Sequence, residues 1–97
     1  MIDTALNFRH MKAERSIGAA LRFLEEQFKI TREQLFLASK GGYLPEDADS
    51  GEFSKAIISD LVQKKLIVEE DIVTECHCMH PNFLKYSLEK SLSNLGV

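Results

Sequence analysis

The stretch that decides the fold is Leu35-Phe36-Leu37-Ala38-Ser39-Lys40-Gly41-Gly42. Its first four residues are apolar without alternation, and the glycine pair ends the run. A short apolar run bounded by turn signals is typical of a strand that is buried on both faces. Because such strands occur in parallel sheets covered by helices, this stretch indicates the α/β class.

Helical spacing of apolar residues predicts three helices, one before this strand and two after it. The first covers residues 13–28, and Thr31 begins a short capped turn after it. The second covers residues 53–65. The third begins at Pro81, which suits a first helical position, and stops at Gly96. Its apolar stripe, which we expect to pack on a sheet, consists of Leu84, Leu88, Leu92 and Leu95.

A second strand is predicted at Met1–Thr4, whereas residues 66–74 alternate poorly and are expected to form an irregular insertion. The order strand, helix, strand, insertion, helix favours a parallel sheet of βα units within a single domain, residues 1–97. Two strands leave sheet edges open, and open edges invite pairing with another chain. We therefore expect self-association through exposed sheet edges.

Composition and charge narrow the class of protein. The chain has 97 residues and a net charge of −3, which gives no electrostatic attraction to nucleic acid or to an anionic membrane. It has no apolar run of the ~20 residues that span a bilayer, and no secretory signal pattern. Because its two cysteines form no disulfide framework, we expect a cytoplasmic location. The charge and the lack of a long apolar run lead us to expect neither nucleic-acid nor membrane partners.

Two charged residues, Asp3 and Lys40, lie just after the predicted strands. Active sites of parallel α/β proteins gather at this end of the sheet. An aspartate and a lysine brought together there could tune a third group that gives or takes a proton. The alternative is a strand-end salt bridge with no catalytic role, and residue spacing alone favours that alternative.

Three other motifs are interpreted as structural. In Cys76-His77-Cys78-Met79-His80, all the potential zinc ligands fall within five residues, without the second pair that a structural zinc site uses, so we predict no metal site. The acidic segment at residues 46–49 lacks the spacing of a calcium loop. The Gly41-Gly42 pair is too short to cradle phosphate and predicts a turn with a positive φ angle.

Several segments together resemble the aldo/keto reductases. Asp3-Thr4-Ala5-Leu6-Asn7-Phe8-Arg9 and residues 14–21 resemble the second βα unit of that family. Ser39-Lys40-Gly41-Gly42 resembles the end of its third strand, and residues 87–96 resemble the following helix. The Cys76–Pro81 segment resembles an insertion found before that helix in one branch. The resemblance implies a partial (β/α)8 barrel of about two to three βα units, with an insertion before the last helix.

The resemblance also implies a function, the NADPH-dependent reduction of a small-molecule carbonyl substrate. Asp3 matches the family's catalytic aspartate, and Lys40 matches the lysine that lowers the pKa of a proton-donating tyrosine. Phe8 stands in that tyrosine's position, and the catalytic histidine is expected beyond Val97. The cofactor-binding residues stay unknown, and we expect no NADPH binding by this segment alone. The alternative function is a catalytically inactive fragment or pseudoenzyme with a structural or partner-binding role.

Overall fold

The computed structural model describes residues 1–74 and 76–97. Three helices make up most of the regular structure: α1 (Lys12–Phe28), α2 (Ser54–Gln63) and α3 (Pro81–Leu95). Two short 3₁₀ turns, η1 (Arg32–Gln34) and η2 (Glu69–Asp71), precede strands. The strands are β1 (Ile2–Asp3), β2 (Leu37–Ala38), β3 (Ile72–Val73) and β4 (His77–Cys78).

The four strands form two separate sheets of two strands each. β1 and β2 are parallel, with Ile2 opposite Leu37 and Asp3 opposite Ala38. β3 and β4 are antiparallel, and the segment after Gly42 runs beside them, since Cys78 donates its backbone N–H to the Gly42 carbonyl at 2.8 Å. The irregular insertion expected at residues 66–74 is thus the start of a small antiparallel hairpin.

The prediction of a partial (β/α)8 barrel of two to three βα units is wrong. Residues 1–74 and 76–97 form three helices and only two-residue strands, and their second sheet is antiparallel rather than a continuation of the first. Between β2 and α3 the chain forms α2 and the β3–β4 hairpin, so β1 and β2 are the one parallel pair among the described residues. Strands of two residues provide too little face for a layer of helices to cover.

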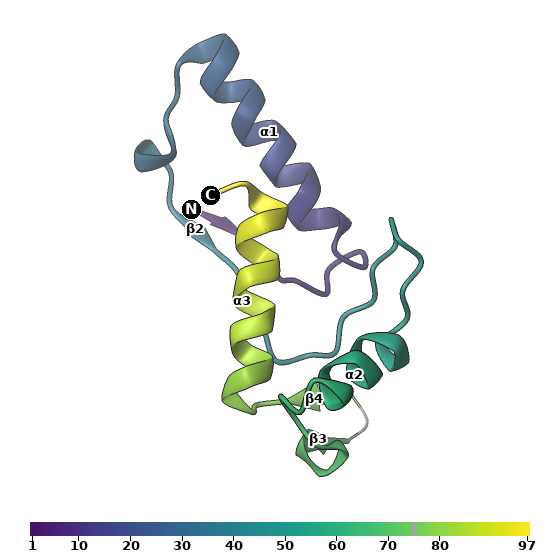
Figure 1. Cartoon of the computed structure of the whole chain (residues 1–97). Helices are drawn as coiled ribbons and strands as arrows, with labels where there is room; N and C mark the ends of the chain where they lie inside the picture. The colour runs from purple at the N-terminus through teal and green to yellow at the C-terminus, as the bar shows by residue number, and fades with distance from the viewer. Residues whose placement is uncertain (75) are drawn as a thin grey trace.

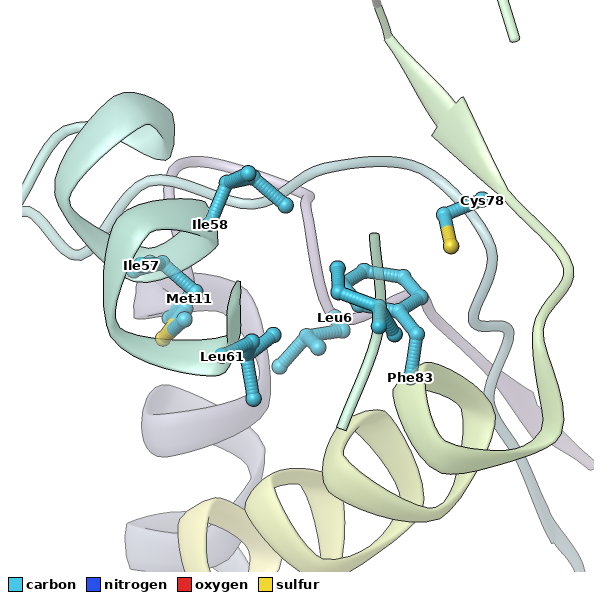
Figure 2. Packing of buried hydrophobic residues seen from close by; sticks show 8 residues of the cluster. Leu6, Met11, Ile57, Ile58, Leu61, Cys78 and Phe83 are labelled. Carbon is cyan, nitrogen blue, oxygen red and sulfur yellow. The ribbon is translucent and has the colours of Figure 1, made fainter. Parts of the chain in front are cut away.

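The hydrophobic core lies where α2, the hairpin and the start of α3 meet the loop after β1. Figure 2 shows Phe83 at its centre, with Leu6 beside it and Leu61 of α2 facing both. Phe83, Met11 and Cys78 are fully buried. The cluster consists of Leu6, Met11, Ile57, Ile58, Leu61, Ile67, Cys78 and Phe83. This core joins the two halves of the sequence.

Helices α1 and α3 pack against each other away from that core (Figure 1). Their contact is close at Gly18, where an added Cβ would lie 2.5 Å from the Asn94 carbonyl oxygen, and Asn94 of α3 also donates a hydrogen bond to the buried Glu14 of α1. The apolar stripe predicted for α3 is largely outside the core, since Leu88 is 60% exposed and Leu92 is 42% exposed. The strand predicted to be buried on both faces is likewise covered only in part, with Phe36 exposed.

Candidate functional site

Parallel pairing of β1 with β2 brings the ends of both strands to one place. Lys40 Nζ lies 2.7 Å from Asp3 Oδ1 and donates a second hydrogen bond to the Thr4 carbonyl at 3.0 Å. The ladder continues past the strands, because Leu6 donates its N–H to the Lys40 carbonyl. The two charged residues identified from the sequence are therefore in direct contact.

Phe8 completes this cluster from the turn that leads into α1. Its ring centroid lies 5.4 Å from Lys40 Nζ, within the range of a cation–π contact. The cluster is open to solvent, since the side chains of Lys40 and Asp3 are 55% and 52% exposed. An ion pair this exposed contributes at most about 1 kcal/mol to stability. The arrangement holds an ammonium group against an aromatic face that has no proton to give.

His10, a potential substitute proton donor, turns towards the acidic loop. Its Nδ1 lies 3.7 Å from Glu46 Oε2, and its side chain is 63% exposed. It belongs to a run of three residues with positive φ angles, Arg9 to Met11, through which the chain reverses into α1. His10 therefore lies at the surface, directed to Glu46.

A polar network that the sequence analysis did not identify holds the end of β2. Glu14 is completely buried, and it accepts hydrogen bonds from Ser39 Oγ at 2.6 Å and from Asn94 Nδ2 at 3.0 Å. Ser39 directly precedes Lys40, so this bond fixes the backbone from which the lysine side chain extends. The sequence offered one signal, a glutamate four residues before Gly18 on a face that would otherwise be apolar.

The network continues to the acidic loop through Arg15. Its Nε donates to Asn94 Oδ1 at 3.1 Å, and its two terminal nitrogens contact the carboxylate of Asp47 at 2.6 and 3.0 Å. Asp49 accepts a further bond from the same guanidinium at 2.6 Å. The Arg15 bonds hold the pKa of Asp47 well below its usual range, against the opposing effect of burial. The acidic loop is therefore clamped to α1.

The cysteine and histidine segment has structural partners of its own. The His80 Nδ1 accepts the backbone N–H of Asn82 at 3.1 Å and so caps α3, while the His77 ring meets Tyr43 edge-on at 5.0 Å. Cys78 is buried in the core and Cys76 is exposed. In residues 1–74 and 76–97, no three histidine, cysteine or acidic side chains are grouped so that they could hold a metal ion.

Gly42 has the positive φ angle expected of the glycine pair, at 113°. A side chain there would also meet the His77 ring, because an added Cβ would lie 2.8 Å from Nε2.

Among the described helices, none combines the length and the apolar content needed to cross a bilayer.

Known proteins offer no match to this chain. No protein-family model, no curated protein and no solved structure matches it.

Proposed function

We propose that the cluster of Asp3, Lys40 and Phe8 is a carbonyl-reductase site of the aldo/keto type that Phe8 has silenced. The observation that carries the proposal is the position of the Phe8 ring, 5.4 Å from an ammonium group that Asp3 holds in place. The chain is then a pseudoenzyme with a structural or partner-binding role.

The chemistry of carbonyl reduction explains why this one residue decides activity. As hydride reaches the carbonyl carbon, the carbonyl oxygen must receive a proton from a group within hydrogen-bond reach. A phenol beside an ammonium group can supply that proton, whereas a phenyl ring cannot. Acid–base assistance of this kind contributes about 10²–10⁴-fold to rate.

The surroundings of Lys40 also bear on the cofactor. The pocket that adjoins it has a volume of about 280 Å³, and half of its lining residues come from α3, four of them leucines. Pockets that enclose a small molecule typically measure about 300–1,000 Å³, and a dinucleotide needs groups for its phosphates as well. We infer that a pocket of this volume is too small to enclose NADPH. We therefore expect no saturable change in NADPH fluorescence when the chain is added.

The Phe8→Tyr variant tests whether Lys40 is placed to tune a proton donor. With the 5.4 Å from Nζ to the ring centre as the separation, Lys40 alone would stabilise a tyrosinate in water by about 0.8 kcal/mol, a pKa lowered by about 0.6 unit. This is an upper limit, because Asp3 carries the opposite charge 2.7 Å from Nζ. The new phenol is measured as the difference between the ultraviolet titrations of the variant and the wild type. Removing the cation with Lys40→Met should abolish the lowering, and removing the counter-charge with Asp3→Asn should enlarge it.

Phe53→Tyr is a matched control, because Phe53 is an exposed phenylalanine, 69% accessible, at the start of α2. A phenol there should titrate at its ordinary pKa. If the phenol at position 8 titrates like the one at position 53, the lysine does not act on it and the proposal fails. Reduction of an aromatic aldehyde by the wild-type chain with NADPH would instead identify an active reductase.

A further inference from the structure

A groove lies between α3 and the segment formed by β2 and the residues after it. It is the pocket of about 280 Å³ that adjoins Lys40, and Arg32 and Val97 also line it. Leu37 of β2 and the following Ser39, Lys40 and Gly41 form one wall, and α3 forms the other with Leu84, Ser87, Leu88, Ser91, Leu92 and Leu95. We call this feature the β2 groove.

The hydrogen-bond register of the sheet shows which backbone groups face the groove. The carbonyls of Phe36, Ala38 and Lys40 accept hydrogen bonds from β1. In a strand, the residues between them turn their N–H and C=O groups to the opposite edge. Those residues are Leu37 and Ser39, and both line the groove. The groove therefore has an open strand edge along one side.

The other wall offers apolar surface beside that edge. Leu88 is 60% exposed and Leu92 is 42% exposed, although both belong to the stripe of α3 that the sequence predicted to be core. An open backbone edge beside an apolar wall is the arrangement that accepts an added strand.

The chain exposes more surface than a folded monomer of its mass typically does. The chain exposes 6557 Å², whereas a folded monomer of 11.0 kDa typically exposes about 5,600 Å². The excess of about 950 Å² is of the same order as the ~800 Å² that each partner contributes to a stable interface. The radius of gyration, 14.6 Å, likewise exceeds the ~12.5 Å typical of this length.

We propose that a second copy of this chain occupies the β2 groove and forms a twofold dimer. Antiparallel pairing of the two β2 strands places Leu37 of each copy opposite Ser39 of the other, so that both open edges are satisfied by one contact. The twofold axis then stands perpendicular to a four-stranded sheet. Both α3 helices lie on the same face of that sheet, where their exposed leucines meet. This proposal does not depend on the function proposed above.

Sedimentation equilibrium of the whole chain tests the proposal directly. We expect a monomer–dimer equilibrium, with the amide protons of Leu37 and Ser39 protected from exchange in the dimer. The double variant Leu88→Glu, Leu92→Glu should weaken dimerisation by at least about 100-fold, because four apolar side chains leave the interface of each dimer. Circular dichroism should show the variant folded, since both leucines are already largely exposed in the single chain.

Two matched variants complete the design. Phe53→Glu introduces a single negative charge at an exposed apolar residue outside the groove and should leave the dimer intact. Leu37→Pro removes an N–H that faces the groove and should weaken the dimer without removing a bond to β1. A monomer at every concentration, an open-ended oligomer, or a dimer unaffected by the leucine variant would overturn the proposal. If the chain stays monomeric and its groove binds an extended peptide of unrelated sequence, the occupant is not a second copy and the proposal fails.

Discussion

Replacing Asp47 by asparagine should show how much the clamp between α1 and the acidic loop contributes to stability. The Asp47 carboxylate is only 7% exposed and accepts two hydrogen bonds from Arg15, at 2.6 and 3.0 Å. It also accepts the backbone N–H groups of Asp49 and Ser50. An asparagine keeps an oxygen for those N–H groups but turns an amide towards Arg15. The change therefore removes the ion pair together with one of its two hydrogen bonds and leaves the backbone contacts in place.

We expect Asp47→Asn to lower the free energy of unfolding by about 2 kcal/mol, below the ~3–5 kcal/mol of a fully buried pair because Arg15 is 27% exposed and keeps Asp49. In a domain of this size that corresponds to a melting temperature lower by about 10 °C. Asp49→Asn is a matched control, because Asp49 also lies 2.6 Å from Arg15 but its side chain is 55% exposed. That variant should lose only about 0.5 kcal/mol.

The pH dependence gives an independent check. The pKa of Asp47 is lowered in the folded state, chiefly by the Arg15 hydrogen bonds. Its contribution to stability is therefore complete above the unfolded-state pKa of about 3.9 and is lost as the pH falls further, towards the folded pKa. Urea unfolding should give a constant difference between wild type and Asp47→Asn above about pH 5 and a shrinking one below about pH 4. The reasoning is refuted if Asp49→Asn costs as much, or if the difference does not shrink in acid.

Two further substitutions test the contact between α1 and α3. Gly18→Ala should destabilise the chain by about 1–3 kcal/mol in thermal melts, although alanine is the better helix former, because its Cβ would lie 2.5 Å from the Asn94 carbonyl oxygen; a more stable variant would contradict this. Glu14→Met should cost about 1–3 kcal/mol, since Ser39 Oγ and Asn94 Nδ2 both lose their acceptor. Unchanged stability would show that neither partner needs that acceptor.

Local signals in the sequence predicted the helices and the pairing of strand ends. Pro81 does begin α3, Gly96 ends it in the left-handed conformation, and the backbone N–H of Thr31 donates to Gln34 as a capped turn requires. Asp3 and Lys40 meet because parallel strands bring their carboxyl ends together. These features depend on a few neighbouring residues or on a single pairing.

Burial and long-range contacts were predicted less well. Apolar periodicity assigned Leu88 and Leu92 to the core, but no second layer covers that face of α3 in the single chain. The same reasoning gave no place to Glu14, whose partners Ser39 and Asn94 are 25 and 80 residues away. Periodicity reports which side of an element is apolar, and it does not report whether anything lies opposite.

The burial of Glu14 also affects the order in which the chain assembles. Its carboxylate stays hydrated until the end of β2 and the last turn of α3 have both arrived, because each supplies one of its two hydrogen bonds. Closing loops of 25 and 80 residues carries a large entropy cost before any contact repays it. Docking α1 ahead of either partner would bury an unsatisfied charge. We therefore expect the carboxylate to disfavour states in which only one of its two partners is in place.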